Sequence, residues 1–511
     1  MRKLNSLKNL LTTAFSYVIL ALLGFVRIKV FISSLGEEIY SINQLFYQIF
    51  AYLSIAEAGV GALICQKYYK LLIEKKTDDI NVIHTTARSF LRKISLGMFI
   101  VGVIISFGLK FLTNNSLSLG YMQIVFMLFM IRNLIDYLMY TPRLLMQADQ
   151  KSYATNSIVN AYKIIEIALE IVLLYNKVNY AYILIPTIII RIIMNYFVNK
   201  RVYREYPWLK VVEKKDNSVL KESKYILGIR VATIVANNTD ILIVSKFLTP
   251  LAVTIYSSYN YIIKFAIDAA NLVLNALVAS FGNVMHSKED EKKSAIFEQL
   301  NSLFICLASF LAVAMAYLLS KLVNIWLGAD KIIDPLSLIF MVIILYQNVS
   351  RLMFNAMRDV QGWFKQTQWI AYIEGIGNIV LSIILLQYFD MAGILLATVL
   401  INAFTSFLYY PIYTYKKLFN KKPILYYVKF FANFAFAAVL IWLSYKFGAN
   451  IQMNNYFELI YKGTIYMGIV GLLILLFNYI CFKDFRDFMK NIKSLIIDIL
   501  NKKKAKQENN V

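Results

Sequence analysis

Apolar runs long enough to cross a lipid bilayer recur along almost the whole of this 511-residue chain. A helix needs about 20 residues to cross a hydrocarbon core roughly 30 Å thick. Fourteen such runs are delimited, at 10–33, 38–65, 87–112, 119–142, 153–176, 179–199, 224–246, 252–282, 295–320, 333–357, 368–387, 391–414, 425–446 and 458–482. A backbone in lipid must satisfy its own hydrogen bonds, and the alternation of barrel strands is absent. We therefore predict an all-α integral membrane protein with about 14 transmembrane helices.

The composition limits what else the chain can contain. Hydrophobic residues make up 59% and charged residues 16% of the sequence, and the mean hydropathy is +0.59. Little is left for a soluble catalytic domain, and there is no G-x-x-x-x-G-K-[ST] loop to bind ATP by that route. The first run lacks a small-residue cleavage site and is followed at once by another, so it is predicted to be a retained helix. We do not expect an enzyme.

Lysine and arginine gather in alternate loops, which predicts the orientation of the chain. Examples are Lys67 after the second run, Arg201 after the sixth and Lys416 after the twelfth. By the positive-inside rule these loops and both termini are cytoplasmic, in a multi-pass protein of the bacterial cytoplasmic membrane. The net charge of +23 is spread over short loops between apolar helices. This favours contact with anionic membrane lipids over binding of nucleic acid.

The sequence predicts two halves of six spans each, followed by an additional pair of spans. Ile39-Tyr40-Ser41 after the first run matches Ile255-Tyr256-Ser257 after the seventh, and 182–187 resembles 393–398. Six spans in each half give both halves one orientation, so the repeat is predicted to be parallel. The predicted domains are a six-helix bundle at 1–199, a linker at 200–223, a second bundle at 224–416, an appended helix pair at 417–482 and a basic tail at 483–511.

Histidine and cysteine do not indicate a chemical site. Cys65, Cys306 and Cys481 are isolated in or beside apolar runs, which suggests neither a disulfide framework nor a metal site. His84 and His286 fall in polar connections, and we interpret both as solvated loop residues.

Charged residues inside the apolar runs are the candidates for function, since each costs about 2.5–3.5 kcal/mol at mid-bilayer on insertion scales. Arg132 and Asp136, like Lys264 and Asp268, are four residues apart and close enough to pair. Lys163, Glu166 and Glu170 share one face of a helix. Such groups either neutralise one another on buried faces or line an aqueous cavity.

Three arginines have no acidic neighbour at helical spacing: Arg27, Arg230 and Arg351. Arg351 belongs to a polar stripe with Asn348, Asn355 and Arg358. A guanidinium fork fits a phosphate bidentately, so these arginines, together with Lys264, are the predicted substrate-binding residues. The alternative is pairing with acids on other helices.

Three acids are candidates for coupling to protons or sodium ions: Glu57, Asp240 and Glu374. Burial and neighbouring charges readily move the pKa of a carboxylate, which such coupling requires. The alternative role is that of a counter-ion to one of the arginines. No other cofactor is expected.

Several short segments resemble the multidrug/oligosaccharidyl-lipid/polysaccharide exporter superfamily, and in particular its Wzx-like polysaccharide-repeat-unit flippases. They are Leu35-Gly36, Ile39-Tyr40-Ser41, Glu57-Ala58-Gly59-Val60-Gly61, Asn238-Thr239-Asp240, Ile255-Tyr256-Ser257 and Met391-Ala392-Gly393-Ile394-Leu395-Leu396-Ala397-Thr398. The resemblance covers essentially the whole chain. Thr249-Pro250 stands where the family usually has a glycine.

This resemblance implies two six-helix bundles around a central cavity that opens alternately to either face of the membrane. The implied cargo is an undecaprenyl-pyrophosphate-linked oligosaccharide, flipped for capsule or O-antigen assembly. A polysaccharide polymerase and chain-length machinery are the implied partners. Two alternatives stay open: a lipid II flippase, and a drug/cation antiporter of the same superfamily.

Overall fold

The computed structural model describes residues 2–57, 60–216, 239–285, 290–448 and 451–494. Every regular element among them is a helix. The chain is therefore an all-α multi-pass membrane protein, as the apolar runs predict. By contacts the chain divides into two compact units: unit 1 is Met1–Ser257 with Ala371–Ile383, and unit 2 is Ser258–Ile370 with Ile384–Val511. The finer division into bundles, linker and appended pair stays a prediction.

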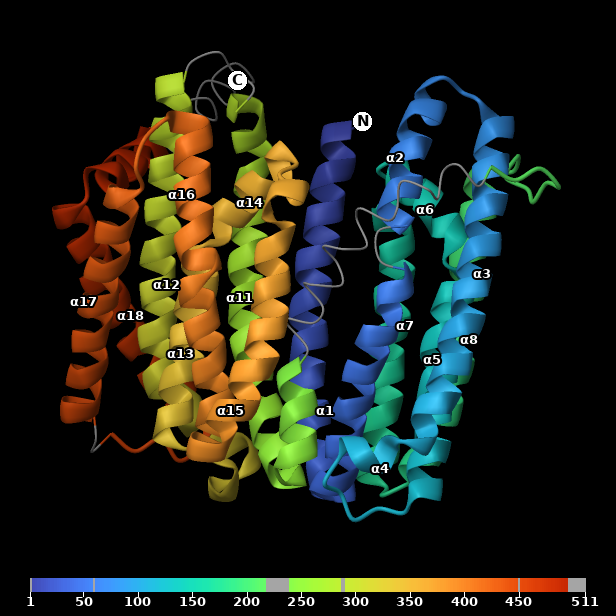
Figure 1. Ribbon diagram of the computed structural model, residues 1–511, viewed down its shortest axis with the longest axis horizontal. Helices are drawn as coiled ribbons and strands as arrows, with labels where there is room; N and C mark the ends of the chain where they lie inside the picture. Colours follow the sequence, from blue (N-terminus) through green and yellow to red (C-terminus); the bar gives the residue numbers. More distant parts are fainter. Residues whose placement is uncertain (1, 58–59, 217–238, 286–289, 449–450, 495–511) are drawn as a thin grey trace, which may run out of the picture. The chain divides into compact units, whose positions relative to one another are not determined.

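Among the described residues up to Glu205, the chain forms eight α-helices and one 3₁₀-helix (Figure 1). They are α1 (Arg2–Leu53), η1 (Ser54–Glu57), α2 (Val60–Ile73), α3 (Thr77–Phe107), α4 (Leu109–Leu112), α5 (Leu119–Met139), α6 (Thr141–Ala148), α7 (Ser152–Tyr175) and α8 (Tyr180–Glu205). Within this half, α5 packs against α3 and α8, while α7 packs against α1 and α8.

The second half holds α11 (Pro250–Met285), α12 (Asp290–Leu327), η2 (Ala329–Lys331), α13 (Pro335–Ser350), α14 (Leu352–Gln361), α15 (Phe364–Phe404), α16 (Ser406–Phe419), α17 (Ile424–Gly448) and α18 (Tyr456–Cys481). A helical segment at 239–247 precedes them. In this half α12 is the central helix, since α13, α17 and α18 all pack against it.

Eight described helical stretches are long and apolar enough to cross a membrane, and nine if the bent pair α13 and α14 counts as one span. One of these stretches, Phe364–Phe419, contains two of the predicted spans, and another, Phe15–Leu53, overlaps two. The predicted spans at 153–176 and 252–282 coincide with α7 and α11, which carry charges. The seventh predicted span, 224–246, lies mainly outside the described residues.

Two sharp breaks separate spans inside continuous helices. Gly36 has φ +81° inside α1, and Asp390 has φ +48° inside α15. At each break one residue with a positive φ interrupts the helix and redirects the chain, which explains why each of these helices includes parts of two predicted spans. At the second break a Cβ added to Gly393 would lie 2.2 Å from the carbonyl oxygen of Leu385, so only glycine fits there.

Polar residues at the helix starts satisfy backbone donors. Ser118 begins α5 and accepts a hydrogen bond from Tyr121 N, while Asp334 precedes Pro335 and accepts one from Ser337 N at 2.8 Å. Thr249-Pro250, the departure from the family pattern, follows the same rule. Thr249 Oγ1 accepts from Ala252 N at 3.2 Å, and Pro250 is the first residue of α11.

The two triplets that suggest a repeat occupy similar environments. Tyr40 and Tyr256 are both buried, at 1% and 5% exposure, and the serine after each is also buried. Ser41 Oγ donates to Glu38 O, and Ser257 Oγ donates to Val253 O, each within its own helix. The triplets thus lie alike near the start of a span, as a parallel repeat predicts.

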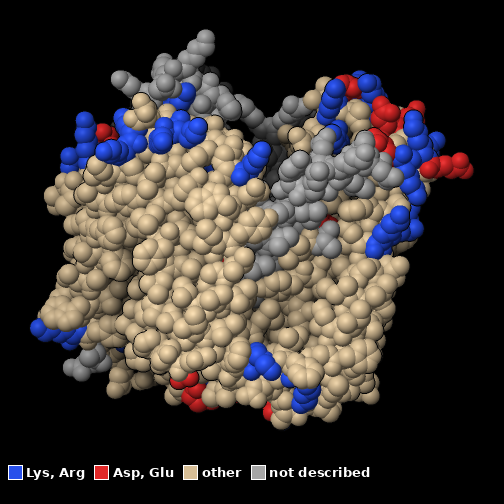
Figure 2. Space-filling view, viewed as in Figure 1, with Lys and Arg blue, Asp and Glu red and all other residues tan. Residues whose placement is uncertain are grey.

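Charged side chains gather at the ends of the helices. In Figure 2 the blue Lys and Arg atoms lie at these ends, and the wide tan belt between them shows almost no charge on this face. Many apolar side chains remain exposed, among them Ile104 at 65%, Leu472 at 63% and Ile480 at 69%. Such a surface suits hydrocarbon rather than water.

One histidine differs from the prediction. His84 is completely buried, not solvated, because α3 begins at Thr77 rather than near residue 87. It therefore lies two turns inside a helix, next to the buried side chains of Ile80 and Ala87. His286 lies outside the described residues. The three cysteines are free thiols.

Candidate functional site

Six charged side chains from four helices meet inside unit 1, and we call them the N-terminal charge cluster. The members are Arg27 of α1, Arg132 and Asp136 of α5, Glu166 and Glu170 of α7, and Arg191 of α8. The three guanidinium groups and three carboxylates balance one another in formal charge.

Arg191 links two helices within this cluster. Its Nη1 donates to Asp136 Oδ2 at 2.7 Å, and its Nε donates to Glu166 Oε2 at 3.2 Å. Asn195, one turn further along α8, donates to the second oxygen of Asp136 at 2.8 Å. The four-residue spacing predicts that Asp136 pairs with Arg132 of its own helix. In the structure Asp136 instead pairs with Arg191 and Asn195 of α8.

Arg132 and Arg27 complete the cluster. Arg132 is 2% exposed; its Nη1 lies 3.6 Å from Glu166 Oε1, and its Nη2 donates to Tyr47 Oη at 2.9 Å. Arg27 Nη2 donates to Glu170 Oε1 at 2.7 Å. Arg27, predicted as a substrate ligand, thus has a carboxylate partner on another helix.

The three charged residues predicted to share one face of α7 lie in two different environments. Glu166 and Glu170 are buried at 5% and 2% exposure, whereas Lys163 is exposed. In a low-dielectric interior a buried pair gains little net stability, but removing one partner leaves a charge that is costly to bury. The cluster therefore fixes the positions of α1, α5, α7 and α8.

Arg351 lies in unit 2, at the junction between α13 and α14, where the helix axis bends by 41°. Its Nη2 donates to Asn348 Oδ1 at 2.7 Å, and its Nη1 donates to Asn402 Oδ1 at 3.4 Å and to Ser406 Oγ. These three oxygens are amide and hydroxyl oxygens without formal charge. They orient the guanidinium fork at the first turn of α14, where backbone N–H groups also favour an anion.

Asp240 lies in the helical segment at 239–247, in unit 1. Tyr256 Oη donates to Asp240 Oδ2 at 2.8 Å, and the neighbouring Thr239 shares a 2.6 Å hydrogen bond with Tyr52. Asp240 is half-buried. It is thus a carboxylate held by a tyrosine in a polar setting, which is compatible with ion coupling.

Four predicted site residues remain, namely Glu57, Glu374, Lys264 and Arg230. Glu57 ends η1, and a Cβ on Gly61 would lie 3.7 Å from its Oε1. Glu374 is half-buried on α15, whereas Lys264 is exposed on α11. Arg230 lies outside the described residues.

The sequence analysis did not identify the buried cation Lys429 as a candidate. Lys429 of α17 is 1% exposed, and its Nζ lies 2.8 Å from Glu298 of α12 and 2.6 Å from Asp484, beyond α18. One turn along, Asn433 and Asn478 exchange hydrogen bonds between α17 and α18. The signal was a lysine near the start of an apolar span, with asparagine four residues later.

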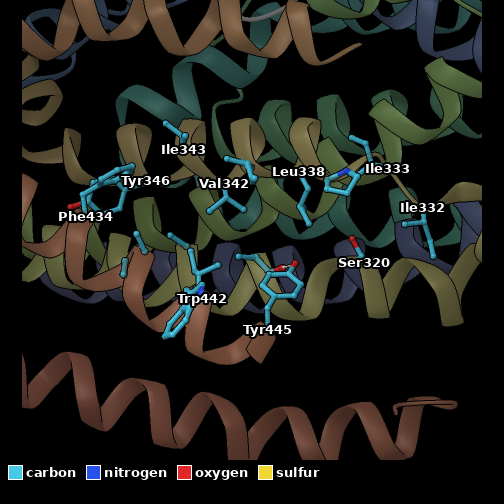
Figure 3. A pocket seen from close by; sticks show the side chains of 17 residues that line it. Ser320, Ile332, Ile333, Leu338, Val342, Ile343, Tyr346, Phe434, Trp442 and Tyr445 are labelled. Atoms are coloured by element: carbon cyan, nitrogen blue, oxygen red, sulfur yellow. Dashed lines mark hydrogen bonds between the residues drawn. The ribbon is translucent and has the colours of Figure 1, made fainter. Parts of the chain in front are cut away.

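Unit 2 also contains an apolar cavity of about 590 Å³ between α12, α13 and α17. Figure 3 shows Leu338 and Val342 of α13 opposite Trp442 and Tyr445 of α17. The Tyr445 hydroxyl donates to Ala316 O at 2.7 Å, so its polar atom is satisfied within the wall. The cavity is therefore suited to a hydrocarbon group of small-molecule size.

Comparison with known proteins bears on the fold. No protein-family model matches the sequence, and no curated protein matches it. Among solved structures, a lipid II flippase, MurJ, in an inward closed conformation is similar with a TM-score of 0.68 and 16% identity, covering 93% of this chain and 98% of that one. This chain therefore shares the fold of that flippase.

Two further structures agree. An inward-facing multidrug resistance MATE family transporter of the MOP superfamily gives a TM-score of 0.59 at 13% identity, over 82% of this chain and 95% of that one. A MOP superfamily transporter from Pyrococcus furiosus gives 0.55 at 11% identity, over 83% and 96%. At these identities the similarity concerns the fold. The Wzx-like subtype and the cargo are matters of proposal.

Proposed function

We propose that this protein is a flippase for undecaprenyl-pyrophosphate-linked oligosaccharide repeat units, working by alternating access in surface polysaccharide assembly. The observation that carries the proposal is Arg351, whose fork is oriented by three neutral oxygens at the broken junction of α13 and α14. A pyrophosphate placed here would accept two parallel charge-assisted hydrogen bonds from this fork.

The apolar cavity supports a lipid-linked cargo. Its volume of about 590 Å³ lies in unit 2, the same unit as Arg351, and its lining is hydrocarbon and aromatic. A cargo with an anionic head and an isoprenoid tail needs both kinds of environment. The full-length similarity to a lipid II flippase supports the same class of amphiphilic cargo.

In this proposal Arg230, Lys264 and Arg27 add positive charge along the path of the headgroup. Arg27 would do so while its pairing with Glu170 holds it in place. Asp240, Glu57 and Glu374 would couple transport to protons or sodium ions. A polysaccharide polymerase and chain-length machinery would act on the flipped product.

The test uses purified protein in proteoliposomes loaded with a fluorescent undecaprenyl-pyrophosphate oligosaccharide, with quenching from outside to report flipping. Arg351→Ala should weaken cargo binding by roughly tenfold or more, since a charge-assisted bond contributes about 1.5–3 kcal/mol. Arg351→Lys should be intermediate because the ammonium keeps charge but loses the fork. Arg92→Ala, at an exposed arginine of α3, is the matched control. Normal flipping by Arg351→Ala would refute the assignment of this residue.

The same vesicles address coupling. With an imposed proton or sodium gradient, Asp240→Asn should lose the dependence of flipping on the gradient while still binding cargo. An unchanged dependence would assign Asp240 a structural role.

A lipid II flippase is the second candidate, favoured by the similarity to MurJ over nearly the whole chain. Lipid II and a repeat-unit cargo share the polyprenyl pyrophosphate, so they differ only in the sugar and peptide. Flipping of lipid II faster than of the peptide-free cargo would favour the second candidate. Gradient-driven uptake of a cationic dye, with neither lipid moved, would favour a drug/cation antiporter instead.

A further inference from the structure

A groove of about 520 Å³ opens between the ends of α7 and α8 in unit 1. It is lined by Ser157, Ile158, Ala161 and Tyr162 of α7, and by Phe197, Lys200, Arg201 and Arg204 of α8. None of these residues belongs to the cargo site proposed above.

The groove changes from charged to apolar with depth. α7 begins at Ser152 and α8 ends at Glu205, so the two ends lie at one face of the membrane. The cations of α8 lie within its last six residues, whereas Phe197 lies about 12 Å below Glu205 at 1.5 Å per residue. The rings of Tyr162 and Phe197 stack there, with centroids 6.0 Å apart and an angle of 24°.

The deep part of the groove has a packed apolar floor. Val159 of α7 and Met194 and Val198 of α8 are buried together, and Ile158 and Tyr162 pack against them. Phe197 is 43% exposed, so one ring face remains open. This part of the groove offers hydrocarbon contacts only.

The mouth of the groove has an excess of positive charge. Its cations are Lys200, Arg201 and Arg204, and the acid beside them, Glu205, is shared: it lies 3.2 Å from Arg201 and 3.0 Å from Lys151. Lys200 and Arg204 are exposed. An anion at the mouth would therefore meet positive charge that Glu205 does not fully balance.

We propose that this groove binds one anionic phospholipid of the adjoining leaflet. Its phosphate lies between Lys200 and Arg204, and the first carbons of an acyl chain lie along Tyr162 and Phe197. Basic pockets between transmembrane helices are a recognised kind of site for anionic headgroups. A free phosphate ion would use only the mouth, whereas a zwitterionic lipid brings a cation beside its phosphate, which the positive charge of the mouth disfavours. From the mouth to the floor the groove changes from charged to apolar, which matches a ligand with an anionic headgroup and a hydrocarbon chain.

The test measures lipid adducts of the full-length protein in detergent by native mass spectrometry, with phosphatidylglycerol as the probe and phosphatidylcholine of the same chains as reference. Lys200→Gln/Arg204→Gln should weaken phosphatidylglycerol binding roughly thirtyfold. Lys416→Gln/Lys417→Gln removes the same charge from the last turn of α16 and should change it little. Equal losses in the two double variants would overturn the proposal, as would equal binding of the two lipids by the unmodified protein.

A second variant separates a lipid from a free anion. Ala161→Trp fills the exposed apolar part of the groove and keeps every charge. It should abolish the phosphatidylglycerol adduct while leaving binding of glycerol phosphate and the thermal midpoint unchanged. Retained phosphatidylglycerol binding in this variant would overturn the proposal. So would displacement of phosphatidylglycerol by an equal concentration of undecaprenyl phosphate, which would assign the groove to the carrier lipid.

Discussion

Arg27 and Arg351 show two ways of accommodating a guanidinium inside the membrane. Arg27 is 2.7 Å from the carboxylate of Glu170 and belongs to a cluster of balanced charges. Arg351 donates to the neutral oxygens of Asn348, Asn402 and Ser406. In the first case a carboxylate holds the guanidinium, and in the second case hydrogen bonds to amide and hydroxyl oxygens orient it.

The pairing of Arg27 with Glu170 predicts a large effect on stability. Glu170→Ala should lower the free energy of unfolding by about 3–5 kcal/mol, because it leaves a buried guanidinium without this carboxylate. The double variant Arg27→Met/Glu170→Leu should recover much of the loss, since no charge then remains to be buried. Thermal unfolding in detergent, followed by circular dichroism, provides the comparison.

An exposed pair serves as the control for this cycle. Lys70 and Glu74 are 3.8 Å apart, with exposures of 81% and 32%. Glu74→Ala should leave the unfolding midpoint unchanged, as surface pairs contribute little. If Glu170→Ala also leaves the unfolding midpoint unchanged, the N-terminal charge cluster does not stabilise the fold.

At the scale of single residues, the sequence identifies the charged residues inside apolar runs but not the residues with which they pair. Arg132 and Asp136 satisfy the four-residue spacing, yet Asp136 bonds to Arg191 of another helix. Spacing along one helix is visible in a sequence, whereas the rotation of neighbouring helices is not. Lys429 was missed for the same reason, because both of its acids lie more than 50 residues away.

At the scale of elements, periodic apolar runs predict the spans well and their ends less well. The predicted boundary near residue 34 falls close to the break at Gly36, and the boundary between 387 and 391 contains Asp390. By contrast, α3 extends ten residues beyond the predicted start at 87, and this places His84 in the interior. Helix ends rich in polar residues carry no apolar signal, so such extensions are invisible to hydropathy.

The turn at Asp390 depends on one glycine. Gly393→Ala should destabilise the protein by at least about 1–3 kcal/mol, because the new Cβ would lie 2.2 Å from Leu385 O and the backbone must shift. Gly468→Ala in α18 is the matched control, since a Cβ there has no atom within 4 Å. It should be neutral or stabilising by about 0.5–1 kcal/mol. Equal unfolding midpoints for the two variants would show that the turn can relax.

At the scale of the whole molecule, an all-α multi-pass membrane fold is combined with a strong bias toward basic residues. The chain carries 53 Lys and Arg against 30 Asp and Glu. Several acids inside the two units pair with cations of the same unit, such as Glu166 with Arg191 and Glu298 with Lys429. The excess of cations therefore lies at the helix ends, where it orients the protein and meets anionic headgroups.

This excess predicts the orientation of the protein in the cell. Asn454 lies in the connection between α17 and α18, and Lys422 in the connection between α16 and α17; both side chains are exposed. The basic loops are predicted to be cytoplasmic, so Lys422 should lie inside and Asn454, one span further along, outside. In a chain with Cys65, Cys306 and Cys481 replaced by serine, Asn454→Cys should react with an impermeant maleimide added to intact cells. Lys422→Cys should react only after the membrane is opened. The reverse pattern would place the termini outside and move the phospholipid groove to the opposite leaflet.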